Sequence, residues 1–241
     1  MLKFPNPHLP KIKTLGIIGK GKFGQLIEKL AHEQHIETVS VNRASDETCW
    51  SKLENAHVWI DVAHAEGLEK RLERAKKLQI PVIIGTTGLG NDLEKWVTGT
   101  SLLDWGLLVG ANFNPMVSLF YHICESLYQK SRLLSTFETH IKEIHHVHKK
   151  DAPSGTALEL QHRLEQLGAP FKTIESIREG DVKGTHILEL TGPCDKWTIG
   201  HQSLCRESFA NGALLAAQWM IGRKGFYKFQ DVILDLSGLK L

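Results

Sequence analysis

Strand-length apolar runs alternate with amphipathic, helix-length segments through roughly the first half of the chain. The apolar runs fall at residues 13–19, 36–42, 57–63, 81–88 and 106–113. Between them, residues 25–33 and 67–80 place apolar side chains at helical spacing, and a short helix is predicted around residues 93–97. Strands that alternate with helices pair in parallel through right-handed crossovers. This half therefore predicts an α/β fold with a doubly wound parallel sheet.

The rhythm changes after about Tyr128. Residues 137–147 read as a strand and residues 153–168 as an amphipathic helix. Three strand-like segments follow without helices between them, at residues 172–179, 184–192 and 195–204. Such a run favours a separate, smaller α+β part with a mostly antiparallel sheet. The last stretch predicts a helix over residues 207–222 and a closing strand over residues 231–236.

Composition excludes several classes of function. The 241 residues are 41% hydrophobic and 23% charged, with a formal net charge of +2, so neither nucleic acid nor an anionic membrane is an expected partner. No apolar run approaches the roughly 18 residues that span a bilayer, and the first residues lack the apolar core of a secretory signal. The cysteines show no CxxC pairing, which favours a reducing, cytoplasmic setting: Cys49, Cys124, Cys194 and Cys205.

The first predicted strand runs into a GxGxxG motif. Glycines in such a loop let the backbone approach a pyrophosphate, and the following helix presents unpaired N–H groups and a positive dipole end. Two lysines add local positive charge. The predicted cofactor contacts of this loop are Gly19, Lys20, Gly21, Lys22, Phe23 and Gly24. A glycine turn without a ligand is the alternative interpretation.

Other predicted strand ends face the same edge of the sheet. After the second strand, Asn42-Arg43 replaces the acid that often holds the ribose hydroxyls, so Arg43 is a candidate for pairing with a 2′-phosphate. This favours NADPH, or use of both NADPH and NADH. Two further strand ends supply small residues beside a nicotinamide and its ribose: Gly85, Thr86 and Thr87, and Gly110, Ala111, Asn112 and Phe113.

The segment EIHHVHKKDAPSGTALEL, residues 143–160, combines three histidines and two lysines ahead of a turn and a helix. Such a group is typical of a site for an anion, a proton or a metal. His146 and His148 share a strand face at i, i+2 spacing. No acid or cysteine at ligand spacing joins them, so no metal site is expected.

Together with GKGKFG, IGTTGL and GANF, that segment resembles the dihydrodipicolinate reductase family, also called 4-hydroxy-tetrahydrodipicolinate reductase. SIREGDVKGTHIL, IGHQSLCRESFANGALLAAQW and GFYKFQDVI agree with it, so the resemblance covers nearly the whole chain from about Lys13. It implies a Rossmann-like nucleotide domain over residues 1–114. A substrate and oligomerisation domain would follow over residues 115–206, and residues 207–241 would return to the first domain. It also implies a homotetramer built on a four-stranded sheet.

The resemblance further implies NAD(P)H-dependent reduction of a small cyclic dicarboxylate in diaminopimelate and lysine biosynthesis. Carried over by position, His145 matches an acid/base histidine and Lys149 a proton-donating lysine, while His146, Gly155 and Thr156 match substrate contacts. The chemistry agrees, because a dianion needs fixed donors and hydride delivery to an imine-type ring leaves a site that takes a proton. We expect Lys149 to be the more critical donor, with His145 stabilising or relaying.

Some features depart from the family's pattern. Asn42 stands where many members keep an acid, which bears on NADH preference, and Asn114-Pro115-Met116 replaces the usual serine and glycine after ANF. The alternatives are a nucleotide-binding sensor without catalysis, a metal-dependent hydrolase built on the histidines, and a dehydrogenase acting on aspartate or homoserine. The last does not account for the DAPSGT run.

Overall fold

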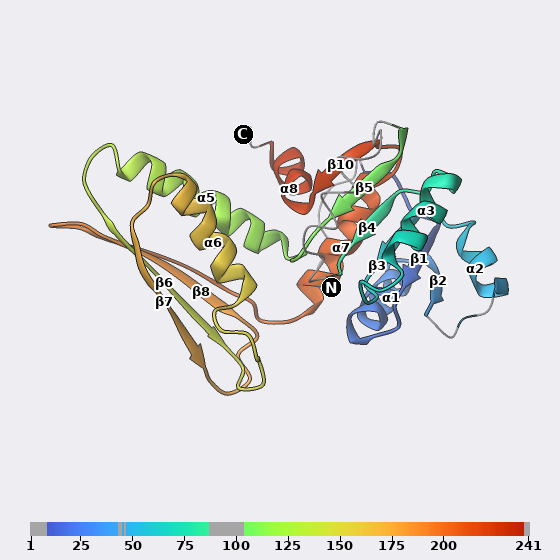
Figure 1. Ribbon diagram of the computed structural model, residues 1–241, viewed down its shortest axis with the longest axis horizontal. Coiled ribbons are helices and arrows are strands. Elements are labelled where there is room, and N and C mark those ends of the chain that lie inside the picture. Colours follow the sequence, from blue (N-terminus) through green and yellow to red (C-terminus); the bar gives the residue numbers. More distant parts are fainter. Residues whose placement is uncertain (1–8, 43–44, 46, 87–103, 239–241) are drawn as a thin grey trace. The chain divides into compact units, whose positions relative to one another are not determined.

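The computed structural model describes residues 9–42, 45, 47–86 and 104–238 (Figure 1). The helix predicted around residues 93–97 lies outside these ranges. The described residues form two compact units. One comprises those of Met1–Pro115 together with those of Glu207–Leu241, and the other is Met116–Arg206. Each unit has its own sheet; the first unit has two apolar cores and the second has one.

The first unit is built on a six-stranded sheet in which every pairing is parallel. The strand order is β10-β5-β4-β3-β1-β2. The strands are β1 (Thr14–Ile18), β2 (Glu37–Val41), β3 (Val58–Asp61), β4 (Val82–Ile84), β5 (Gly106–Val109) and β10 (Gly225–Lys228). From β1 the chain passes to β2 on one side of β1, and it then crosses to β3 on the other side of β1. The predicted doubly wound sheet is therefore confirmed, and its switch point lies at β1.

Helices cover both faces of this sheet and enclose two apolar cores. One face carries α1 (Lys22–Glu33), α7 (Glu207–Met220) and α8 (Phe229–Ser237), and the other carries α2 (Glu47–Leu53) and α3 (Leu68–Leu78). In α1 the buried positions Ile27, Leu30 and Ala31 form one stripe, as the apolar spacing predicts. The strands are buried on both faces, which explains their nearly continuous apolar sequence.

The prediction of a closing strand over residues 231–236 is wrong, because these residues belong to α8. Phe229, Val232 and Leu236 follow helical spacing and pack against the core with Ile233. The Asp231 carboxylate accepts a hydrogen bond from the backbone N–H of Lys228, 2.7 Å away, which fixes the start of the helix. The last strand is instead β10, just upstream, and it extends the sheet beside β5.

The second unit has a four-stranded sheet with the order β7-β6-β8-β9. Its strands are β6 (Glu138–His145), β7 (Phe171–Arg178), β8 (Thr185–Thr191) and β9 (Lys196–Gln202). The β6–β7 pair is parallel and the other two pairs are antiparallel, so the predicted mostly antiparallel sheet is confirmed. The helices α5 (Pro115–Ser131) and α6 (Gly155–Gln166) pack on one face of this sheet (Figure 1).

The inward row of β6 changes character along the strand. Thr139, Ile141, Glu143 and His145 are buried, whereas the residues between them are more exposed. The row thus runs from apolar core into two titratable side chains at the carboxyl end of the strand. Because burial of a charge is costly unless it is paired, this end of the sheet must supply partners.

Candidate functional site

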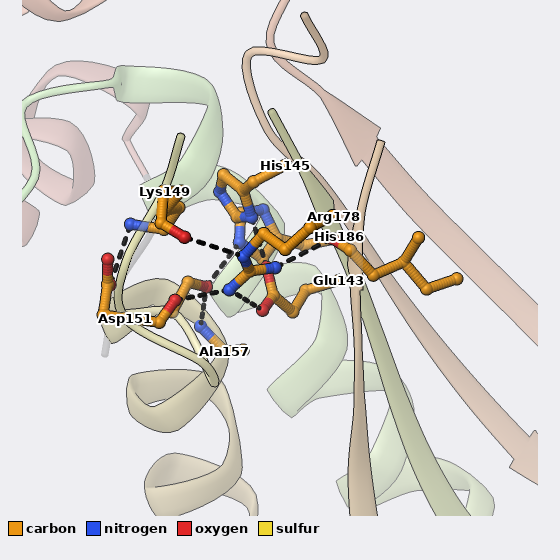
Figure 2. Close-up of polar contacts among 9 residues, drawn as sticks. Glu143, His145, Lys149, Asp151, Ala157, Arg178 and His186 are labelled. Carbon is orange, nitrogen blue, oxygen red and sulfur yellow. Dashed lines mark hydrogen bonds and ion pairs between the residues drawn. The ribbon is translucent and has the colours of Figure 1, made fainter. Parts of the chain in front are cut away.

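A group of buried polar side chains lies at the carboxyl end of β6 (Figure 2). Glu143 and His145 are two residues apart on the inward face of that strand. The sheet register places His186 of β8 opposite Glu143, and Arg178 at the end of β7 opposite His145. The pairing of β6 with β7 and β8 therefore brings four titratable groups to one place, which we call the β6 cluster.

Glu143 is the anion of the β6 cluster. Its side chain is fully buried, its Oε1 lies 2.9 Å from an Arg178 guanidinium nitrogen, and its Oε2 contacts Nδ1 of His145. Burial opposes ionisation, but the bonds from Arg178, Ser176 and His145 outweigh it and hold the pKa of Glu143 below its usual value. Glu143 is therefore a carboxylate at neutral pH.

His145 is neutral under the same conditions. Burial lowers its pKa, the Glu143 carboxylate raises it, and the positive charges of Lys149 and Arg178 lower it, with a net fall below the usual histidine value. A carboxylate accepts hydrogen bonds and cannot donate them. Nδ1 of His145 therefore carries the proton and donates it to Glu143, which leaves Nε2 with a lone pair.

His186 joins the β6 cluster to the start of α6. Its Nε2 lies 3.1 Å from Oγ of Ser154, and that oxygen accepts a hydrogen bond from the backbone N–H of Ala157 at 3.2 Å. Burial above all, and then the neighbouring His145, lower the pKa of His186 to about 3, so the ring is uncharged. Its ring meets that of His145 edge to face, with centroids 5.1 Å apart.

The loop after β6 carries Lys149 and is held by Arg178. The Arg178 guanidinium donates to the backbone carbonyl of Lys149 at 3.3 Å and also to that of Asp151. Nζ of Lys149 lies 2.8 Å from a carboxylate oxygen of Asp151. The strand ends at His145, so the expectation that His146 and His148 share a strand face is wrong; their rings lie tilted, 6.3 Å apart, in and beside a turn.

The predicted carboxylate contacts begin the next helix. Ser154 is the N-cap of α6, and Gly155 and Thr156 are its first two residues. A Cβ placed on Gly155 would meet no atom within 4 Å, so this backbone is open to a ligand. Tyr121 donates a hydrogen bond to the carbonyl of Thr156 at 3.2 Å and ties this helix end to α5. Helix N-termini of this kind favour anions.

In the first unit, the glycine loop follows β1 and opens α1 at the switch point of the sheet. Gly19 has φ +110°, and a Cβ on Gly24 would lie 1.9 Å from the carbonyl oxygen of Gly19, so both positions require glycine. Gly21 is the N-cap without a side-chain hydrogen bond, and a Cβ there would meet nothing within 4 Å. Lys20 and Lys22 are exposed beside it. The loop thus fits a pyrophosphate.

The ends of β4 and β5 meet around Phe113. A Cβ on Gly85 or on Gly110 would approach the Phe113 ring to 2.8 Å and 2.7 Å, and that ring is itself only 3% exposed. Its contact with a cofactor stays a prediction, and its observed partners are core residues.

The other predicted cofactor contacts have different surroundings. Phe23 packs beside the core, and Ala111 is exposed. The Thr86 hydroxyl donates a hydrogen bond to the carbonyl of Ala63, and the Asn112 side chain accepts one from the backbone N–H of Asn114. Arg43 and Thr87 lie outside the described residues.

The β6 cluster contains residue types that often bind metal ions. Among the described residues, Glu143, His145 and His186 bring potential ligand atoms within 4.8 Å of one another. Both Glu143 oxygens, however, already contact Arg178 or His145, and the guanidinium charge opposes a cation at that distance. The arrangement suits proton handling better than metal binding.

The sequence interpretation did not identify Glu143, Arg178 or His186 as site residues. A signal for Glu143 is present in the sequence. It lies two residues before His145 in a strand whose inward positions are otherwise apolar or hydroxyl-bearing. No comparable local signal exists for Arg178 or His186, because they reach the cluster only through strand pairing.

Comparison with known proteins assigns both halves of the chain to one family. Residues 13–113 match the family model described as dihydrodipicolinate reductase, N-terminus, and residues 117–233 match that for its C-terminus. A relative from Caldanaerobacter subterraneus subsp. tengcongensis, named 4-hydroxy-tetrahydrodipicolinate reductase, is 34% identical over 88% of this chain and 94% of the relative. One from Bdellovibrio bacteriovorus with the same name is 32% identical over 95% and 99%.

A solved structure shares the fold. It is described as dipicolinate-bound dihydrodipicolinate reductase from Paenisporosarcina sp. TG-14. It matches with a TM-score of 0.73 and 19% identity over 92% of this chain and 99% of that one. Among the described residues, no helix is long and apolar enough to span a bilayer.

Proposed function

The chain belongs to the dihydrodipicolinate reductase family, and from that membership we propose how its own residues perform the reaction. It is an oxidoreductase that reduces 4-hydroxy-tetrahydrodipicolinate to tetrahydrodipicolinate in diaminopimelate and lysine biosynthesis, using a pyridine nucleotide. The residue roles, the choice between NADH and NADPH, and the assembly described next are proposals. The observation that carries the residue roles is the neutral His145 next to Lys149 beside the start of α6.

The nucleotide is proposed to bind at the carboxyl edge of the six-stranded sheet. Gly19, Gly21 and Gly24 would admit its pyrophosphate to the start of α1, and Lys20 and Lys22 would add positive charge. The ends of β4 and β5, with Gly85, Thr86, Thr87 and residues 110–113, would border the nicotinamide. When bound, the reduced nicotinamide supplies the hydride. Arg43 after β2 supports use of NADPH, alone or together with NADH, because a guanidinium pairs with a 2′-phosphate.

The dicarboxylate is proposed to bind at the start of α6. Gly155 and Thr156 would offer backbone N–H groups to one carboxylate, and His146 and Lys149 would offer side-chain donors. Hydrogen bonds to charged groups contribute roughly 1.5–3 kcal/mol each, so a few such bonds hold a small dianion. The described ligand of the solved relative, dipicolinate, is a compact ring of this chemical class.

Lys149 is proposed as the proton donor and His145 as the group that stabilises or relays the proton. Lys149 is cationic, so it both attracts the dianion and supplies a proton after the hydride has arrived. The neutral His145 has a lone pair on Nε2, which can accept a proton from solvent and pass it to Lys149 after that residue has given its own proton to the substrate. Asp151, which pairs with Nζ of Lys149, holds that side chain until the substrate competes for it.

The open face of the four-stranded sheet is proposed as the contact surface of a homotetramer. The helices α5 and α6 pack on the other face, while Ile144, Ile177 and Ile187 are half-buried and alternate with the inward row. The family resemblance and the absence of a covering helix in the described second unit support this assembly. The cytoplasm is the proposed location. Light scattering should give four times the chain mass.

A coupled assay tests the function and the cofactor together. Dihydrodipicolinate synthase generates the unstable substrate in place, and loss of reduced nicotinamide absorbance is followed with NADH and with NADPH. We expect oxidation that depends on the synthase product. A folded protein that binds both nucleotides but oxidises neither would favour the nucleotide sensor.

Substitution of Arg43 tests the cofactor choice. Arg43→Ala should raise KM for NADPH by about 10- to 150-fold, because one charge-assisted bond to a phosphate is worth roughly 1.5–3 kcal/mol, and should leave KM for NADH nearly unchanged. Lys52→Ala, which removes a positive charge from α2, is the control. Equal effects of Arg43→Ala on the two nucleotides would contradict the 2′-phosphate role.

A further inference from the structure

We propose that Glu143, paired with Arg178, is a positioning residue that fixes the tautomer of His145 and so presents Nε2 to the reacting substrate. This inference rests on the proposed function, because it assigns the proton relay of the same site. Glu143 is fully buried, and its two oxygens contact His145 and Arg178. Glu143 therefore acts in the reaction through His145, by determining which ring nitrogen of that histidine carries the proton.

The contacts of Glu143 determine where the proton of His145 lies. One carboxylate oxygen contacts Nδ1 of His145 and the other lies 2.9 Å from Arg178, so the carboxylate faces a donor on each side. Histidine has one ring proton when neutral, and Nδ1 must carry it to satisfy the acceptor. Nε2 is then an acceptor at the start of each turnover.

His145 is buried, and its Nε2 side faces a glycine. Gly184 lies against it with φ +150°, and a Cβ on that residue would come within 3.0 Å of Nε2. Among the described residues, Nε2 makes no hydrogen bond, whereas Nδ1 is engaged by Glu143. One ring nitrogen is thus anchored to the protein, and the other is left for a proton from outside.

Arg178 couples this anchor to the lysine loop. The guanidinium that neutralises Glu143 also donates to the backbone carbonyls of Lys149 and Asp151. The Glu143–Arg178 ion pair therefore fixes both the orientation of the His145 ring and the backbone of the segment that carries Lys149 (Figure 2). Since Arg178 has a rigid planar fork of donors, lysine at this position could not make the same set of bonds.

A stability role alone is a weaker explanation for the pair. Buried ion pairs pay a desolvation cost that often cancels their attraction, and apolar residues of similar size serve a core equally well. The Glu143–Arg178 pair lies where the inward row of β6 has just been apolar, at Ile141. The charged pair adds two functions. Glu143 accepts the hydrogen bond that orients His145, and Arg178 holds the loop through the carbonyls of Lys149 and Asp151.

The first test measures the tautomer in the wild-type protein, and a variant serves only to assign the signals. Nitrogen-15 NMR of the histidine rings, at neutral pH and without substrate, distinguishes the two neutral tautomers. The signals of His145 are identified by their loss in His145→Gln. We expect the proton on Nδ1 and a bare Nε2. A proton on Nε2 in the wild-type protein would overturn the proposal, whatever the activity of the enzyme.

The second test compares matched variants. Glu143→Gln keeps the shape but removes the charge. Loss of a carboxylate that orients a metal-bound histidine typically costs about 10- to 100-fold in activity, and an orienting carboxylate on a proton-handling histidine should matter to a similar degree. We expect kcat to fall by that factor while KM changes little. The control is Glu159→Gln, which removes an exposed carboxylate paired with Arg163 at 2.6 Å and should leave kcat unchanged.

The pH profile separates positioning from a structural role. Glu143, Lys149, Arg178 and His186 face His145, and among them only Glu143 raises its pKa. The limb of the kcat profile that reports His145 should therefore move to lower pH in Glu143→Gln and stay in place in Glu159→Gln. If Glu143→Gln lowers only the melting temperature, with kcat and the pH limb unchanged, the pair is structural and the proposal fails.

The reductase activity and the positioning role of Glu143 can be disproved independently of each other. An inactive wild-type protein in the coupled assay would sink the proposed function, while the NMR experiment would still report the tautomer of His145. An active wild-type protein with an unshifted limb in Glu143→Gln would leave the function standing and remove only the positioning role.

Discussion

The loop after β1 and the loop after β6 both lead from a strand into a helix whose N-terminus is proposed to bind an anion, yet they are built from different groups. At α1 the N-cap is Gly21, without a side-chain hydrogen bond, and the loop is shaped by glycine packing. At α6 the N-cap is Ser154, which is buried and contacts His186. The loop before α6 is held by an arginine and carries a lysine.

The difference follows from what each anion must undergo. A pyrophosphate is held and released unchanged, so backbone N–H groups and space are sufficient. A dicarboxylate that receives a hydride and a proton needs side chains that hold and move protons, and these need partners that fix their protonation. Substitutions in the two loops should therefore affect different measurements.

The largest effect is expected in the loop after β6. Lys149→Ala removes the proposed donor, and kcat should fall by about 10²- to 10⁴-fold, the usual contribution of a positioned acid. Nucleotide binding, followed by fluorescence titration, should be unchanged. Lys150→Ala removes the same charge one residue later, at an exposed position, and is the control. Near-normal turnover in Lys149→Ala would reverse the proposed order of Lys149 and His145.

In the glycine loop, two substitutions separate the effect of close packing on stability from the effect of open space on nucleotide binding. Gly24→Ala places a Cβ 1.9 Å from the Gly19 carbonyl, so the free energy of unfolding should fall by about 1–3 kcal/mol. Gly21→Ala meets no atom and has φ −71°, so it should fold normally but weaken nucleotide binding. Urea denaturation and nucleotide titration of both variants check this. Full nucleotide affinity in Gly21→Ala would show that the open space is not used.

His186 should make stability depend on pH. Its folded pKa of about 3 lies below the usual 6.5, so its contribution is fully present above pH 6.5 and is lost as the pH falls toward 3. In that window the wild-type protein should lose roughly 1 kcal/mol more per pH unit than His186→Gln, whose side chain takes up no proton. Urea denaturation at several pH values compares the two. Parallel curves would mean that His186 takes up its proton in the folded protein as readily as in the unfolded one.

The smallest effect concerns the cap of α6. Ser154→Ala removes the acceptor for the N–H of Ala157, and loss of such a cap costs about 1 kcal/mol. Ser154→Thr retains the oxygen and serves as the control. Thermal unfolding gives the stability, and KM for the dicarboxylate should rise modestly because the start of α6 is less ordered. An unchanged melting temperature in Ser154→Ala would argue that water replaces the cap without cost.

Local patterns predicted the parallel sheet well because buried strands and amphipathic helices have distinct periods. The glycine loop could also be located from the sequence, since positive φ and close backbone approach demand glycine at Gly19 and Gly24. The error at the C-terminus arose from a short apolar run, Val232 to Leu234, that fits a strand or a helix equally. Its helical neighbours Phe229 and Leu236 decide the matter.

What the sequence determined by itself is the set of features that depend on neighbours along the chain: the sheet type, the glycine loop, the helix predicted over residues 153–168 and the loop that carries Lys149. The tertiary structure decided the protonation of the β6 cluster. Arg178 and His186 reach Glu143 and His145 through strand register, 33 to 43 residues apart in sequence. Burial and nearby charge set a pKa, and both depend on which strands pair, so no local pattern contains them.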